Sequence, residues 1–136
     1  MNKKRIAAML GLALAGALAL VGCRAKSNAG QVPVITAQEA KAMMDEGNVT
    51  VVDVRTAEEY AGGHIPGAIL LPLDSIAEGE MPEALPDKDA TLLIYCRSGR
   101  RSNIAANTLA ATGYTAVYDF GGINDWPYDT VEGDAP

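Results

Sequence analysis

The residues best suited to chemistry form one short run, "CRSGRRS", in which Cys96 is followed by Arg97, Arg100 and Arg101. The whole chain has a formal charge of −6, so this cluster of positive charge runs against its overall composition. Cations and backbone N–H groups stabilise the thiolate, which is the nucleophilic form of cysteine. The run therefore predicts a reactive thiolate in an anion-binding loop, and Gly99 allows the tight curvature that such a loop needs.

Such a loop needs a strand before it and a helix after it to hold the thiol in place. The apolar residues 91–95 predict a buried strand, and residues 102–112 predict a helix that ends at Gly113. In open α/β sheets, ligands bind beyond the carboxyl ends of the strands, where helix amino termini and their N–H groups converge. Cys96 stands at such an end. The alternative is that Cys96 is a buried, unreactive residue and that the arginines form a solvated surface.

Strands alternate with helices along the rest of the chain. Short apolar runs rich in β-branched residues predict further strands at 49–54, 68–71 and 115–120. Two capping boxes predict helices that begin after Thr36 and after Thr56. The expected fold class is α/β, with a small, mainly parallel central sheet of about five strands and helices on both faces.

The helix predicted at 102–112 has apolar and small residues at a one-sided spacing. The residues expected on its buried face are Ile104, Ala105, Leu109 and Thr112. A helix with one such face packs against a sheet, and we therefore place it over the strand that precedes Cys96.

Three stretches, in the expected order, resemble the signatures of the rhodanese-like sulfurtransferases in their single-domain form: "VDVRTAEEYAGGHIPGA", "IYCRSGRRS" and "GGINDW". The resemblance runs from about Ile35 to Trp126. It implies that Cys96 takes the outer sulfur of a donor such as thiosulfate or a persulfide and passes it, as a cysteine persulfide, to a thiophilic acceptor. The implied partners are small anionic sulfur compounds and a thiol or a protein that accepts the sulfur.

The length of the loop separates two related activities. The six residues from Cys96 to Arg101 match the loop length of the sulfurtransferases, whereas the related phosphatases have one residue more. Tyr95 also differs from the histidine that typically precedes a phosphatase cysteine. By the resemblance, Arg101 holds the loop and the anionic donor, while Arg97 and Arg100 contribute to substrate selectivity. The substrate-binding loop expected is Arg97, Ser98, Gly99, Arg100 and Arg101.

Four residues outside the loop are candidates for supporting roles. Asp53 and Arg55 match the family's "DVR" segment, which implies a polar network that braces the site. His64 is the only histidine and could act as a general base, but its place in "GHIPGA" matches a family turn and favours a structural role. Trp126 either covers the loop or packs against the core, and we expect packing.

The amino terminus has the three-part order of a secretory signal. Basic residues at 3–5 precede an apolar run at 6–21, and the run ends in "LVGC", which resembles the lipobox of bacterial lipoproteins. A permanent membrane helix is the alternative, although the run is shorter than the ~20 residues needed. We expect Cys23 to be lipidated and to anchor the protein outside the cytoplasm, at a bacterial membrane. The predicted segments are a signal peptide at 1–22, a lipidated tether at 23–33 and a rhodanese-like domain at 34–136.

Composition and spacing also limit the functions that we consider. The acidic charge argues against nucleic acid as a partner, because nucleic-acid binding needs a basic surface. No group of cysteines, histidines and carboxylates has metal-ligand spacing, and we expect no metal, no cofactor and a monomer. Two other functions remain open: a cysteine phosphatase or arsenate reductase, and a non-catalytic module that carries a persulfide or binds a partner.

Overall fold

The computed structural model describes residues 31–136, and these contain one parallel sheet. Its strand order is β2-β1-β3-β4, and each neighbouring pair is parallel. The strands are β1 (Val49–Asp53), β2 (Ile69–Leu70), β3 (Thr91–Cys96) and β4 (Ala116–Gly122). The predicted α/β class is confirmed, but the sheet has four strands rather than about five, because beside β4 only Val34 forms a single bridge, to Asp119.

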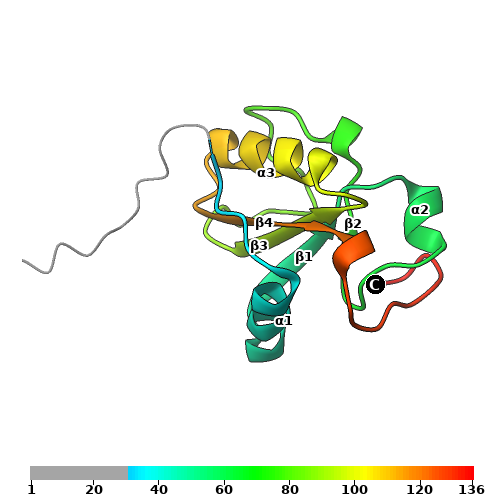
Figure 1. Cartoon of the computed structure of the whole chain (residues 1–136). Helices are drawn as coiled ribbons and strands as arrows, with labels where there is room; N and C mark the ends of the chain where they lie inside the picture. Colours follow the sequence, from blue (N-terminus) through cyan, green and yellow to red (C-terminus); the bar gives the residue numbers. More distant parts are fainter. Residues whose placement is uncertain (1–30) are drawn as a thin grey trace, which may run out of the picture.

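Helices cover both faces of this sheet, with α3 on one face and α1 on the other (Figure 1). The capping boxes predicted at Thr36 and Thr56 are both formed and begin α1 and α2. The helices are α1 (Ala37–Glu46), α2 (Ala57–Ala61) and α3 (Arg100–Thr112), with single turns η1 (Leu73–Ser75) and η2 (Ile123–Asp125).

Two hydrophobic cores lie on opposite faces of the sheet. On the α3 face, Ala105, Ala106 and Leu109 pack with residues of β1 and β3 such as Val52 and Ile94. On the α1 face, the buried residues are Ala40, Val51, Ile65, Ala68, Leu93, Tyr95 and Phe120. Because successive side chains of a strand point to opposite faces, neighbouring residues at the end of β3 belong to different cores.

The prediction for the buried face of α3 is confirmed at Ala105, Leu109 and Thr112 and is wrong at Ile104. The helix begins at Arg100, two residues earlier than expected, and Ile104 is 43% exposed. Ser102 and Ala106 lie inward instead, together with Ala105. The small side chains at these positions set which face of the helix meets the sheet, and Ile104 lies beside that face.

The folded region starts before the predicted boundary. Val32 is only 7% exposed and its N–H donates to Asn107 Oδ1 at 2.9 Å, so the end of the predicted tether at 23–33 belongs to the fold. The predicted signal at 1–22 and the lipidation site Cys23 lie outside the described residues. Within residues 31–136, no helix has the length and apolarity needed to cross a membrane.

Candidate active site

Cys96 is the last residue of β3, and the loop that follows it bends back to start α3. Gly99 adopts φ +106°, a left-handed conformation that favours glycine, and its N–H donates to Cys96 Sγ at 3.0 Å. No side chain caps the first turn of α3, so the N–H groups of that region lie open toward the thiol. Cys96 is 1% exposed, which leaves a narrow approach to Sγ.

The surroundings of Cys96 favour its thiolate. Burial raises the pKa of the thiol, but hydrogen bonds from the Ser102 hydroxyl and from the backbone N–H groups of Ser102, Gly99 and Ser98 outweigh burial and hold the pKa below its ordinary value. A thiol with a lowered pKa has a larger nucleophilic fraction near neutral pH. These hydrogen bonds favour the thiolate, and within residues 31–136 the partners of Sγ are the Ser102 hydroxyl and backbone N–H groups.

Arg101 ties this loop to α2. Its guanidinium makes two bonds to Glu59, from Nη1 to Oε1 at 2.7 Å and from Nη2 to Oε2 at 2.9 Å. These bonds lower the pKa of Glu59 to about 2 and raise the pKa of Arg101. Since Glu59 also closes the capping box with Thr56, one carboxylate fixes both the start of α2 and the loop-closing arginine.

The other two arginines of the loop are exposed. Among the described residues, neither Arg97 nor Arg100 pairs with a carboxylate. Arg97 lines a pocket of about 330 Å³ beside the loop, together with Arg55 and Asn124. Glu58 and Glu59 also line this pocket, and Cys96 does not. A guanidinium without a carboxylate partner can bind an anion, so Arg97 is available to a ligand at this edge of the loop.

Asp53 and Arg55 form a buried ion pair at the end of β1. Arg55 Nη2 lies 2.7 Å from Asp53 Oδ2 and also donates to the Gly63 carbonyl at 2.7 Å. Burial lowers the pKa of Arg55, but the bonds to Asp53 outweigh burial and raise it. Burial and the same carboxylate raise the pKa of Tyr95, whose hydroxyl accepts a bond from the Ile65 N–H at 3.1 Å. These groups form the predicted polar network on the α1 face of the sheet.

His64 lies in a structural position and not beside the thiol. Its ring is buried and stacks on Tyr60, with centroids 3.6 Å apart. Nδ1 lies 2.9 Å from the Tyr60 carbonyl oxygen and Nε2 lies 2.8 Å from the Ala135 carbonyl oxygen. The backbone of His64 also pairs with Val131. His64 therefore holds the carboxyl-terminal segment against the domain, and its hydrogen bonds do not reach Cys96.

The family of the chain follows from its sequence over most of this fold. Residues 36–128 match the family described as the rhodanese-like domain. This chain belongs to the rhodanese-like family. The match includes β1, the loop after Cys96 and the glycines at the end of β4, which are the parts that form the site.

Curated and solved relatives agree with this rhodanese assignment. The chain is 40% identical over 82 residues to "Thiosulfate sulfurtransferase PspE" of Escherichia coli strain K12, covering 60% of this chain and 78% of that protein. It is 38% identical over 106 residues to "Thiosulfate sulfurtransferase GlpE" of Pseudomonas entomophila, covering 74% and 94%. A solved "rhodanese with anions from E. coli" is 39% identical with a TM-score of 0.56, covering 62% of this chain and 98% of that one.

Four residues of the rhodanese site were not singled out from the sequence as parts of it. In the sequence, Glu59 is visible only as the acidic residue of the capping box that begins at Thr56, and Ser102 only as the first residue of the helix predicted at 102–112. Asp119 is a carboxylate inside the apolar run "TAVYDF", which is the signal that could have revealed it. A Cβ on Gly122 would lie 2.1 Å from the Arg97 carbonyl oxygen, so β4 can approach the loop only because this residue is glycine.

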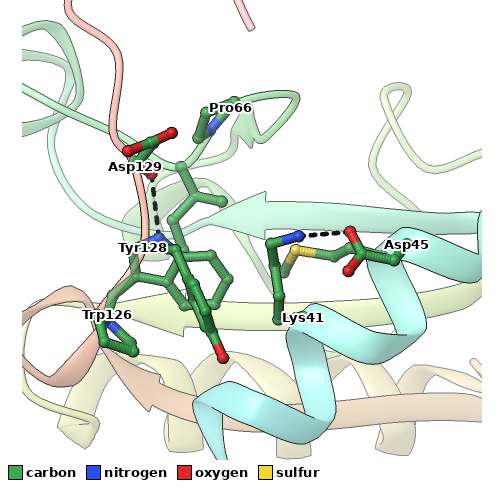
Figure 2. Close-up of a pocket in the computed structure, with 9 residues that line it drawn as sticks. Lys41, Asp45, Pro66, Trp126, Tyr128 and Asp129 are labelled. Carbon is green, nitrogen blue, oxygen red and sulfur yellow. Dashed lines mark hydrogen bonds and ion pairs between the residues drawn. The ribbon is translucent and has the colours of Figure 1, made fainter.

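A separate pocket of about 540 Å³ lies between α1 and the carboxyl-terminal segment (Figure 2). Lys41 and Asp45 line it from α1, and Trp126 and Tyr128 line it from the other side. Trp126 packs on Phe120, with ring centroids 5.9 Å apart, and its Nε1 donates to the Asp129 carbonyl. Trp126 packs against the core on the α1 face, whereas Cys96 belongs to the core on the α3 face, so Trp126 has the packing role that we expected.

Proposed function

We propose that this protein transfers a sulfane sulfur from a donor such as thiosulfate or a persulfide to a thiophilic acceptor, through a persulfide on Cys96. The chain is an enzyme of the sulfurtransferase class, as its family and its relatives indicate. Our proposal adds to this enzyme class the identity of the donor, the persulfide intermediate and the acceptor. The observation that supports them most strongly is a thiol with a lowered pKa at the carboxyl end of β3, facing the N–H groups of its loop.

In the first step, the Cys96 thiolate attacks the outer sulfur of thiosulfate. A bond forms between Sγ and that sulfur, the sulfur–sulfur bond of thiosulfate breaks, and sulfite leaves with the electron pair. In the second step, a nucleophile such as cyanide or a thiolate attacks the outer sulfur of the persulfide. The bond to Sγ then breaks and the Cys96 thiolate is restored. Neither step requires an oxidant, a reductant or a metal.

The shape and charge of the site suit this donor. Because Cys96 is 1% exposed, a substrate must reach Sγ with a small, protruding atom, and the terminal sulfur of thiosulfate is one. Arg97 and the backbone N–H groups of the loop can balance the negative charge of the donor. A relative at 39% identity is described as a rhodanese with anions, which supports an anion site in this family.

The test is the formation of thiocyanate from thiosulfate and cyanide by the full chain. We expect turnover in the wild type, none in Cys96→Ser, and unchanged turnover in Cys23→Ser, since the arginine-rich loop follows Cys96 in the sequence. Asp45→Asn, a surface change on α1, serves as the control variant and should retain the turnover of the wild type. Equal thiocyanate formation by the wild type and Cys96→Ser would overturn the proposal.

Two other outcomes would identify the alternatives left open by the sequence. Hydrolysis of an aryl phosphate or reduction of arsenate, without thiocyanate formation, would indicate a phosphatase or arsenate reductase. A stable sulfur adduct on Cys96 that no acceptor removes would indicate a persulfide carrier or a partner-binding module. The six-residue loop favours the sulfurtransferase over the first of these.

We also propose that lipid attached to Cys23 anchors the enzyme to a bacterial membrane outside the cytoplasm. The support is the order of basic residues, apolar run and "LVGC" at the amino terminus. Metabolic labelling with palmitate should mark the wild-type chain and not Cys23→Ala. Label that persists in Cys23→Ala would contradict the anchor.

A further inference from the structure

The Ser102 hydroxyl is surrounded by more hydrogen-bond acceptors than it can satisfy. Its Oγ lies 2.7 Å from Asp119 Oδ1, 3.1 Å from the Gly99 carbonyl oxygen and 3.3 Å from the Gly121 carbonyl oxygen. Cys96 Sγ lies 3.5 Å away. A serine hydroxyl has one proton to donate and can accept through its lone pairs. Of these four neighbours, only the protonated thiol of Cys96 can donate to Ser102.

Asp119 is the strongest competitor for that one proton. Its side chain is 3% exposed, lies on β4 next to β3, and makes the shortest contact to Ser102 Oγ. Hydrogen bonds to a carboxylate are stronger than those to a carbonyl. Asp119 Oδ1 also accepts from the Gly121 N–H at 2.9 Å, and Oδ2 lies 3.5 Å from Asn103 Nδ2. With the hydroxyl donated to Asp119, Ser102 can accept from the thiol but cannot donate to the thiolate.

We propose that Asp119 is a positioning residue that competes with Cys96 for the single Ser102 hydroxyl proton and thereby sets how readily Cys96 ionises. When the thiol loses its proton to a base in solution, the Ser102 hydroxyl turns from Asp119 to Sγ. Asp119 then keeps the Gly121 N–H and the Asn103 amide as donors. The exchange is possible because no cation holds Asp119: among the described residues, its side-chain partners are all neutral.

The same exchange bears on sulfur transfer, and this step rests on the proposed function. A persulfide moves the negative charge from Sγ to the outer sulfur, so Sγ no longer needs the Ser102 hydroxyl. The hydroxyl returns to Asp119, and the carboxylate thus favours the loaded enzyme over the free thiolate.

Other charged groups near Cys96 remain the same in every variant below. They are Arg101 from α3 with its partner Glu59 from α2, and the Asp53–Arg55 pair at the end of β1. Arg97 and Arg100 are exposed. A shift caused by a change at Asp119 or Ser102 can therefore be compared directly with the wild type.

The first measurement is the ionisation of Cys96 in Asp119→Asn, a variant with the same shape and no charge. We follow the ultraviolet absorbance of the thiolate and the rate of iodoacetamide alkylation against pH, with the full-length Cys96→Ser chain as the blank. The pH at which half of Cys96 is ionised, the midpoint of the titration, should fall by about one unit in this variant. The rate of alkylation at pH values below the midpoint should therefore rise about tenfold. Asp45→Asn, on the surface of α1, should leave the midpoint unchanged. An unchanged or raised midpoint in Asp119→Asn overturns the proposal.

The second measurement asks whether the effect acts through Ser102. Ser102→Ala should raise the midpoint, because the thiolate loses its hydroxyl donor. In the Ser102→Ala background, adding Asp119→Asn should shift the midpoint by less than it does alone, since no shared proton remains. An equal shift in both backgrounds means that Asp119 acts only through space, and it overturns the competition.

Folding is checked for each variant by circular dichroism, and Asp119→Ser serves as a second uncharged variant if Asp119→Asn does not fold. Alkylation needs no sulfur donor, so this experiment can succeed even if thiocyanate formation fails. The two proposals are therefore tested separately.

Discussion

Two neighbouring residues at the end of β3, Tyr95 and Cys96, belong to two very different polar networks on opposite faces of the sheet. On the α1 face, Tyr95 lies with the Asp53–Arg55 ion pair. On the α3 face, Cys96 lies with Ser102 and Asp119. Each network contains one buried carboxylate, at Asp53 or at Asp119. The carboxylates differ in what holds them.

Asp53 is fixed by a charged partner, whereas Asp119 is not. The guanidinium and backbone N–H of Arg55 bond both oxygens of Asp53, and Arg55 reaches on to Gly63. Among residues 31–136, the donors to Asp119 are all neutral, and one of them is the Ser102 hydroxyl, for which Cys96 Sγ is a second acceptor. A charged partner therefore holds the carboxylate on the α1 face, whereas we infer that the contact between Ser102 and Asp119 on the α3 face rearranges as the charge on sulfur changes.

The largest effect should come from breaking the rigid network. Asp53→Ala leaves Arg55 buried without its counter-ion, so we expect a loss of about 3–5 kcal/mol in the free energy of unfolding. Urea denaturation followed by circular dichroism measures it. Asp45→Ala, on the surface of α1, should cost less than about 0.5 kcal/mol. Similar costs for the two variants would show that the network on the α1 face is not the support that we describe.

A smaller effect should follow from changing the contact between β4 and the loop. Gly122 has an ordinary backbone conformation, so Gly122→Ala acts through the clash of its Cβ with the Arg97 carbonyl and with Ser98 Cα. We expect a loss of about 1–3 kcal/mol and slower alkylation of Cys96, because the loop must move away from the thiol.

The matched control is Gly47→Ala, whose new Cβ meets no atom within 4 Å but whose φ of +85° is unfavourable for alanine. It should lower stability without changing the alkylation rate. If both variants alkylate at the wild-type rate, the glycine contact does not position the loop.

The smallest effect concerns the ion pair that joins the loop to α2. The folded pKa of Glu59, about 2, lies below its ordinary value of 4.5, so the pair stabilises the fold fully above about pH 4.5 and loses this contribution as pH falls toward 2. Glu59→Gln should cost about 1–2 kcal/mol at neutral pH, after allowance for partial exposure. The free energies of unfolding of the wild type and of Glu59→Gln should therefore converge as the pH falls toward 2.

Glu58→Gln is the control, since Glu58 is exposed on the same helix and forms no ion pair with any described residue. A Glu59→Gln deficit that stayed constant from pH 7 to pH 2 would show that the charge on Glu59 is not its source.

Local patterns in the sequence predict most of the fold. The apolar runs and the capping boxes at Thr36 and Thr56 give the strands and helices of the rhodanese sheet to within about two residues, because these signals depend on neighbouring residues. The prediction for Ile104 is wrong because the small residues Ser102, Ala105 and Ala106 set the face of α3 that meets the sheet. The apolar runs themselves predict four strands, and the fifth strand expected for the fold class is reduced to the single bridge from Val34 to Asp119 beside β4.

The part of the site that depends on neighbouring residues is predictable from the sequence, and the part that depends on distant residues is not. The crowding of arginines after Cys96 is visible in the sequence, but the partner of Arg101 is Glu59, 42 residues away. The partner of Ser102 is Asp119, 17 residues away. Neither pairing leaves a local pattern, since the sheet brings these residues together. Of Glu59, Ser102 and Asp119, only Asp119 stands out in the sequence, because it is a carboxylate within an apolar strand.

The central claim is that Cys96 carries sulfur as a persulfide. Its most direct test is peptide-level mass spectrometry of the full chain after incubation with thiosulfate, which separates Cys96 from Cys23. We predict one added sulfur atom on the Cys96 peptide, its removal by cyanide, and no adduct in Cys96→Ser. A folded wild-type chain whose Cys96 is alkylated readily but gains no sulfur from thiosulfate or from a low-molecular-weight persulfide would contradict the claim.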